Sequence, residues 1–179
     1  MSVAAGALPR FEPLGPLGPR HDRAGFSCGV PELDEYLKVL AGQHAQKKIS
    51  ATTVLLVDSP QRIAGYHSLS SARLNLGELP PALAKLYPRY SEGIPATLLG
   101  RLAVDLSYRG QGWGETLLMN ALEKAWMATS VVASAFIIVR ALDARATRFY
   151  RRYGFTEFPA DPGRLYLPMT TVQKLAEGT

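Results

Sequence analysis

The stretch Leu98-Leu-Gly-Arg-Leu-Ala-Val-Asp-Leu-Ser-Tyr-Arg-Gly-Gln-Gly-Trp-Gly-Glu115 decides the fold, because it joins a strand pattern to a helix pattern through a glycine-rich turn. The apolar run from Leu98 to Val104 predicts an interior strand. Beyond the turn, apolar residues recur at helical spacing, namely Leu117, Leu118, Ala121, Leu122, Ala125 and Trp126. Gly110, Gly112 and Gly114 leave the turn without side chains. The free N–H groups at the helix start can therefore bind an anionic group.

Length, charge and cysteine content limit the class of protein. A chain of 179 residues predicts one domain that buries a core without disulfides or metal. Cys28 is the only cysteine, and no apolar run is long enough to span a membrane, so we expect a soluble cytoplasmic protein without a secretory signal. The net charge of +5 favours polyanionic partners such as RNA, CoA or an acidic protein.

The first half of the chain divides into a proline-rich lead, a helix and a hairpin. Residues 1–20 predict a partly disordered lead with a short strand near Phe11 to Leu14, followed by a single domain over 21–179. Glu32 to Gln46 has helical spacing with Pro31 in the first turn, and Cys28 before it is interpreted as a packing residue. Two strands then form a hairpin, over 51–57 and 62–69.

Between that hairpin and the central strand, the sequence loses its periodicity. Residues 70–95 predict a long irregular loop with a short helix near Pro81 to Leu86, and we interpret it as one wall of an acceptor-substrate site. His67, in the second hairpin strand, is interpreted as a structural or substrate-wall residue in preference to a general base.

The second half alternates strands and helices. Strands are predicted over 135–139, 155–158 and 165–169, the last after a turn at Pro162-Gly163. Helices are predicted over 143–153, ended by Gly154, and over 170–176.

Several phosphate-binding and metal-binding alternatives are excluded by residue type and spacing. A nucleotide-hydrolysing P-loop needs Gly-Lys-Ser/Thr, whereas this turn ends Gly112-Trp-Gly-Glu115. A dinucleotide fingerprint needs GxGxxG spacing in a βαβ unit, which the upstream hairpin does not provide. His21, His44 and His67 are far apart and there is one cysteine, so no metal site is expected.

The remaining pattern resembles the GNAT acetyltransferases. Their acetyl-CoA pyrophosphate loop, Arg/Gln-x-x-Gly-x-Gly/Ala, is matched by Arg109-Gly-Gln-Gly-Trp-Gly114. Their downstream Phe-Tyr-x-x-x-Gly-Phe is matched by Phe149-Tyr-Arg-Arg-Tyr-Gly-Phe155. This resemblance implies an α+β GNAT fold, with a mixed central β-sheet, a splayed central strand pair and flanking helices.

Within that family the chain is similar to the toxins of bacterial type II toxin-antitoxin pairs. The similarity rests on Phe26-Ser-Cys-Gly29, Leu33-Asp-Glu-Tyr-Leu37, Gly65-Tyr66 with Leu69-Ser70, Ile94-Pro95, Leu98 to Asp105, Phe158-Pro159 and Leu167-Pro168. It implies transfer of acetyl from acetyl-CoA to the α-amine of the amino acid on charged tRNA, which blocks translation. It also implies a small ribbon-helix-helix antitoxin and a homodimer. Alternatives are a GNAT N-acetyltransferase for a small amine or a protein N-terminus, and a catalytically silent acetyl-CoA-binding module.

The resemblance also assigns site residues. Leu102, Ala103 and Val104 would bind the pantetheine arm, with the Val104 N–H polarising the thioester carbonyl. Tyr150 would protonate the departing thiolate, beside Phe149 on the cofactor arm. The pyrophosphate loop comprises Arg109, Gly110, Gln111, Gly112, Trp113, Gly114 and Glu115, where Arg109 either adds a charge-assisted contact or stays solvated.

Basic residues are the candidates for the acceptor side. Arg73, Lys85, Arg89 and Arg151 would contact tRNA phosphates, or else form a solvated basic face together with Arg145, Arg148 and Arg152. An aminoacyl ester needs no strong general base, because a peptide α-amine has a pKa of about 7.7 to 8.0 and the adjacent ester lowers it.

Overall fold

The computed structural model describes residues 14–57, 62–89 and 93–177. Phe11 and most of the expected first strand lie outside these residues, as does the turn expected between the hairpin strands, at 58–61. The strand found in the lead is β1 (Gly15–Pro16), which pairs antiparallel with Val54 and Thr53. Among the described helices, none combines the length and the hydrophobicity that a membrane crossing requires.

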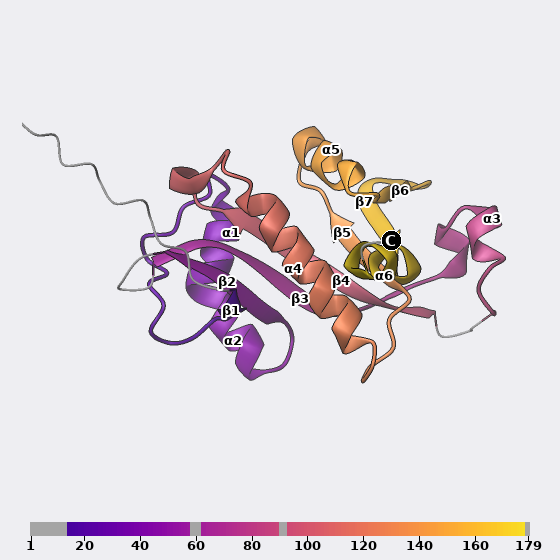
Figure 1. The fold of residues 1–179 in the computed structure, drawn as a ribbon, viewed down its shortest axis with the longest axis horizontal. Helices are drawn as coiled ribbons and strands as arrows, with labels where there is room; N and C mark the ends of the chain where they lie inside the picture. Colours follow the sequence, from indigo (N-terminus) through magenta and orange to yellow (C-terminus); the bar gives the residue numbers. More distant parts are fainter. Residues whose placement is uncertain (1–13, 58–61, 90–92, 178–179) are drawn as a thin grey trace, which may run out of the picture. The chain divides into compact units, whose positions relative to one another are not determined.

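Within the described residues, seven strands form one mixed sheet in the order β1-β2-β3-β4-β5-β7-β6 (Figure 1). The strands after β1 are β2 (Ala51–Val57), β3 (Arg62–Leu74), β4 (Ile94–Val104), β5 (Phe136–Arg140), β6 (Thr156–Phe158) and β7 (Asp161–Pro168). The helices are α1 (Pro31–Glu35), η1 (Tyr36–Leu40), α2 (Ala41–Gln46), η2 (Leu76–Glu78), α3 (Pro81–Ala84), η3 (Leu106–Tyr108), α4 (Trp113–Ala128), α5 (Ala144–Arg152) and α6 (Met169–Glu177). β4 and β5 are parallel, whereas β7 runs antiparallel to both β5 and β6.

The chain forms two compact units, of which the first comprises residues 1–67 and 101–117. Its sheet is covered on both faces, because alternate residues of β2 enter different clusters. Val54 and Leu56 pack with η1, whereas Leu55 and Val57 pack with Leu117 of α4. This two-sided burial explains why β2 has a continuous apolar sequence. The continuous helical run α1–η1–α2, with a π-helical middle turn, lies beside β2 (Figure 1) and confirms the helix predicted over 32–46.

Gly65 permits a close approach between β3 and β4 in this unit. A Cβ atom built on Gly65 would lie 2.8 Å from Leu117 Cδ1 and 3.0 Å from the Ala103 carbonyl oxygen. The flexible leucine end can move aside, but the backbone oxygen belongs to the strand that carries the predicted cofactor-binding residues.

We therefore expect Gly65→Ala to lower the free energy of unfolding by about 1 to 3 kcal/mol, as overpacking does. Gly25→Ala is the matched control. Its Cβ would meet only Asp22 Oδ2 at 3.5 Å, an ordinary contact, so the expected change is within about 0.5 kcal/mol. Urea denaturation of both variants measures the difference. Equal stabilities would show that β3 and β4 can separate without cost.

The second unit comprises residues 68–100 and 118–179. Its core is centred on Phe136 of β5, whose ring lies 4.9 Å from that of Tyr87 and 6.1 Å from that of Tyr166. The parallel ladder between β4 and β5 pairs Ala96–Leu99 with Phe136–Val139, and β4 then continues for five residues to Val104. The pairing of β4 with β5 thus ends at Leu99 and Val139, before the predicted cofactor-binding residues Leu102 to Val104.

Two boundaries differ from those predicted. The loop expected over 70–95 is shorter, because β3 continues to Leu74 and β4 begins at Ile94. In β3, Ala72 and Leu74 face inward and alternate with exposed Ser71 and Arg73, a strand period that small and charged residues conceal. The short helix expected near Pro81 is present as α3.

The turn predicted at Pro162-Gly163 is also wrong. Phe158 pairs with Asp161, so Pro159 and Ala160 form the turn and β7 begins at Asp161. Gly163, with φ of +89°, lies within β7, where its carbonyl accepts the Ala141 N–H at 2.7 Å. The glycine thus accommodates an irregular position within the strand and not the hairpin turn.

Candidate active site

The junction between β4 and the glycine turn is anchored by Asp105, a residue that is 2% exposed in the first unit. Its carboxylate accepts hydrogen bonds from the Ser27 N–H at 3.0 Å and the Ser107 N–H at 2.9 Å. The Arg62 guanidinium forms an ion pair with the same carboxylate, with 3.8 Å between nitrogen and oxygen. Its own N–H donates to the Ala64 carbonyl at 2.8 Å. These bonds fix the direction of the chain where β4 ends at Val104.

The glycine turn has the backbone geometry expected of an anion-binding loop. Gly110 and Gly112 have φ of +74° and +84°, a region that residues with a side chain rarely adopt. A Cβ atom on either glycine would meet no described atom within 4 Å, so open space lies above the loop. The first internal bond of α4 runs from the Thr116 N–H to the Gly112 carbonyl at 3.2 Å. The preceding amides lie at the positive end of the helix dipole.

The other loop residues contribute less through their side chains. Gln111 accepts a hydrogen bond from Trp113 Nε1 at 3.3 Å, and the Trp113 ring packs beside the cluster of Leu55 and Leu117. Glu115 is exposed in the first turn of α4. Its carboxylate would repel an anion, so only its backbone N–H can help to bind one. Gly114 belongs to the same helical turn. These residues therefore act mainly through the backbone.

Arg109 is connected to the segment around Cys28. Its guanidinium donates a hydrogen bond to the Cys28 carbonyl, although the residue is exposed overall. Burial raises the pKa of the Cys28 thiol to about 11. Together with 2% exposure, this pKa matches the predicted packing role, since a nucleophilic cysteine needs an accessible thiolate. Arg109 thus already holds one structural contact.

Tyr150 and Phe149 lie in the second unit, on α5. Asp143 caps this helix by accepting the Ala146 N–H at 2.8 Å, and Gly154, with φ of +91°, follows its last turn. The Tyr150 ring is 7% exposed and packs edge-on against Phe149 and Phe155, at centroid distances of 5.3 and 5.4 Å. The predicted helix and its glycine end are confirmed.

Burial raises the pKa of the Tyr150 phenol to about 12. The hydroxyl has no hydrogen-bond partner among the described residues. A phenol with this pKa stays protonated throughout the physiological range, so the side chain carries a proton that it can donate and does not serve as a base.

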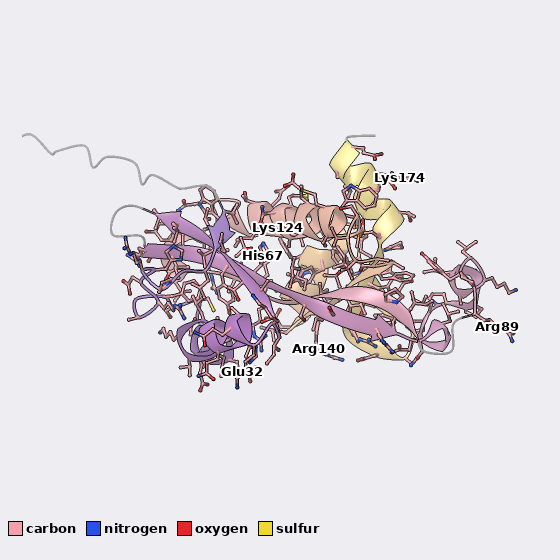
Figure 2. All side chains as sticks on the ribbon, turned by 90° about the horizontal axis from the view of Figure 1, so that it is seen from below. Glu32, His67, Arg89, Lys124, Arg140 and Lys174 are labelled. Atoms are coloured by element: carbon pink, nitrogen blue, oxygen red, sulfur yellow. The ribbon has the colours of Figure 1, made fainter. Side chains whose placement is uncertain are left out.

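The predicted acceptor-side residues also lie in the second unit. Arg73, Lys85 and Arg89 are exposed, and Figure 2 labels Arg89 on the segment that follows α3. Arg151 is exposed and lies 3.6 Å from Glu157, an exposed ion pair that a polyanion can displace.

The segment around η2 is connected to β7 by an ion pair. Arg164 donates to Glu78, and its guanidinium lies 4.4 Å above the Phe158 ring. Burial opposes ionisation of Glu78, but hydrogen bonds from the Asn75 N–H and Arg164 outweigh it and lower the pKa of that carboxyl. No local pattern predicts this contact, because its partners are 86 residues apart in the chain.

His67 is completely buried in β3 (Figure 2), which agrees with the structural interpretation and places no exposed base there. Among the described residues, no group of three or more His, Cys, Asp or Glu side chains is arranged to hold a metal ion.

The sequence matches the model of the acetyltransferase (GNAT) domain over residues 53–157, which contains both the glycine turn and Tyr150. The chain belongs to the GNAT acetyltransferases. The predictions of family, fold and enzyme class are confirmed.

Among GNAT relatives, the chain is 29% identical to a Sinorhizobium fredii protein named "Probable toxin TacT", over 95% of this chain and 97% of that protein. It is 31% identical to the tRNA-acetylating toxin of Mycobacterium tuberculosis, over 86% of this chain and 90% of that toxin. AtaT in complex with acetyl-methionyl-tRNAfMet superposes with a TM-score of 0.85 at 28% identity, over 93% and 99% of the two chains. A Tyr→Phe mutant of AtaT, bound to acetyl-CoA and the C-terminus of the antitoxin AtaR, superposes with a TM-score of 0.76. It is 26% identical to this chain, over 94% of this chain and 99% of that chain.

Proposed function

We propose that this GNAT enzyme transfers acetyl from acetyl-CoA to the α-amine of the amino acid on charged tRNA and thereby blocks translation. The observation that carries this proposal is the similarity, over almost the whole chain, to AtaT in complex with acetyl-methionyl-tRNAfMet. The name of the Mycobacterium tuberculosis relative supports the same acceptor.

The residues of the first unit fit acetyl-CoA as the donor. The open, positive-φ backbone at Gly110 and Gly112 suits the pyrophosphate, together with the N–H groups of Gln111 to Glu115. The backbone of Leu102 to Val104 would bind the pantetheine arm, with the Val104 N–H directed to the thioester oxygen. Acetyl-CoA supplies an activated acyl group, and Arg109 adds positive charge beside the loop.

Proton transfer on the two sides of the reaction has different requirements. The acceptor amine needs no strong base, because an α-amine beside an ester is largely neutral near pH 7. The departing thiolate needs a proton, and we assign its donation to Tyr150, with Phe149 supporting the cofactor arm. Arg73, Lys85, Arg89 and Arg151 are the proposed phosphate contacts on the acceptor side, where each lost contact should weaken salt-dependent binding.

The proposal extends to partners and location. We propose that an antitoxin of the ribbon-helix-helix type neutralises the enzyme. The complex of AtaT with the C-terminus of its antitoxin AtaR supports an antitoxin partner. We further propose that the enzyme forms a homodimer and that it acts in the cytoplasm. A single, buried and unpaired cysteine is consistent with that reducing compartment.

Incubation with labelled acetyl-CoA and total charged tRNA tests this function. We expect label in the RNA fraction that is lost when the aminoacyl ester is hydrolysed. The matched control is the same tRNA deacylated beforehand, which should take up no label. Label found only in small amines or protein N-termini would contradict the proposal and support the alternative GNAT activity.

A further inference from the structure

Several arginines lie over aromatic rings, and among the described residues Arg101 makes the closest of these contacts, within the first unit. The centre of the guanidinium lies 3.7 Å from the centroid of the Tyr36 ring, well inside the range of a cation–π contact. Arg101 is partly buried, and Tyr36 is 1% exposed.

The Tyr36 ring is itself fixed on several sides. Its hydroxyl is 2.7 Å from Ser50 Oγ and 3.2 Å from Thr52 Oγ1, and its face stacks on Tyr66 with an interplanar angle of 24°. Tyr66 in turn donates to the Leu33 carbonyl at 2.7 Å. The platform beneath Arg101 is therefore rigid, and the guanidinium loses little freedom on binding a ligand.

No acceptor within the described residues satisfies the five N–H donors of Arg101. The ion pairs of the described residues involve other arginines, and no carboxylate or carbonyl accepts a hydrogen bond from this side chain. A planar cation that is partly desolvated and has free donors binds an anion more strongly than a fully hydrated surface arginine does.

The position of Arg101 on β4 indicates which molecule supplies the anion. Leu102 and Val104 pack in the cluster of Leu117, whereas Ala103 packs with Tyr36 and Tyr66, so Arg101 shares the Ala103 face. Arg101 also directly precedes the backbone that is proposed to hold the thioester arm. An anion bound by Arg101 would therefore lie on the face of β4 opposite Leu117, next to the segment that is proposed to hold the thioester.

We propose that Arg101, presented by Tyr36, binds a phosphate group at the 3′ end of the acceptor tRNA and so positions the aminoacyl amine. This inference rests on the proposed function, because it takes aminoacyl-tRNA as the acceptor. A guanidinium can bind phosphate oxygens through two parallel hydrogen bonds, which fixes both position and orientation. Arg101 is thus a specificity-determining residue that recognises the nucleic-acid part of the substrate.

Steady-state kinetics with aminoacyl-tRNA provide the first test. We expect Arg101→Ala to raise KM for aminoacyl-tRNA about 10- to 100-fold, with little change in kcat or in the Kd for acetyl-CoA. Arg101→Lys should recover only part of the loss, because lysine presents a point charge. Tyr36→Leu, which removes the ring, should raise KM in the same direction. Tyr36→Phe keeps the ring but loses the hydroxyl contacts with Ser50 and Thr52, so it should raise KM less than Tyr36→Leu does.

Binding of the trinucleotide CCA, which ends tRNA and carries phosphates without an amine, provides the second test. Calorimetry should show weaker CCA binding by Arg101→Ala than by the wild type. Unchanged CCA binding, or a fall in kcat with KM unaltered, would overturn the proposal. Weaker antitoxin binding with unaltered KM would overturn it in favour of a protein carboxylate. If the wild type acetylates no tRNA, the proposed function fails, and the CCA measurement still decides the role of Arg101.

Discussion

Replacing Tyr150 by phenylalanine should lower kcat for acetyl transfer by about 10²- to 10³-fold, within the range that a general acid contributes. The phenylalanine ring keeps the contacts with Phe149 and Phe155, and the lost hydroxyl has no partner among the described residues. The variant should therefore fold normally and bind acetyl-CoA with a Kd within about twofold of the wild type, because only a proton transfer is removed.

Tyr153→Phe is the matched control for this change. Tyr153 lies at the end of the same helix, its ring is 5.2 Å from that of Phe149, and its hydroxyl accepts from Arg152 at 3.0 Å. It occupies a variable position of the family motif, so its hydroxyl should be dispensable and kcat should remain near that of the wild type. Equal losses in the two variants would contradict the assignment of Tyr150.

The pH dependence of kcat/KM gives an independent check on Tyr150. A raised pKa keeps an acid in its protonated, active form to higher pH, and burial raises the pKa of this phenol to about 12. The profile should rise as the acceptor amine loses its proton and should then stay level through pH 9 to 10. A descending limb near pH 10, the ordinary tyrosine value, would show that the acid is an exposed phenol instead.

How well the sequence predicted the fold depended on the strength of each local pattern. The helices at 32–46 and 143–153 and the helix after the glycine turn were predicted because their apolar residues have a clear period, and the glycine turn because glycine tolerates positive φ. The end of β3 was missed because Ser71, Ala72 and Arg73 have little strand propensity, and pairing within the sheet determines their conformation instead.

The candidate site shows the same division between local and long-range information. The residues of the glycine turn and Tyr150 are recognisable from short motifs. Asp105 was not singled out as an anchor, because its partner Ser27 is 78 residues away in the sequence. The stacking of Arg101 on Tyr36 is likewise a contact between distant segments. Such contacts have no local period, and they become visible only when the fold brings the segments together.

Gly112→Val should raise the Kd for acetyl-CoA by about 100-fold or more. A β-branched residue is strongly disfavoured at φ of +84°, at a cost of about 1 to 3 kcal/mol, so the loop would leave its present conformation. The displaced backbone would lose N–H bonds to the pyrophosphate, each worth about 1.5 to 3 kcal/mol because the acceptor is charged. Isothermal titration calorimetry measures the loss directly.

Gly77→Val separates backbone geometry from the mere addition of a side chain. A Cβ on Gly77 also meets no described atom within 4 Å, but the φ of Gly77 is not in the positive region. Its acetyl-CoA affinity should therefore stay within about twofold of the wild type, well below the tenfold change that corresponds to about 1.4 kcal/mol. If Gly112→Val kept its affinity as well, the pyrophosphate would have to be bound by side chains such as Arg109, and the glycines would serve only the path of the chain. A loss confined to Gly112→Val would instead place the cofactor phosphates on the backbone at the start of α4.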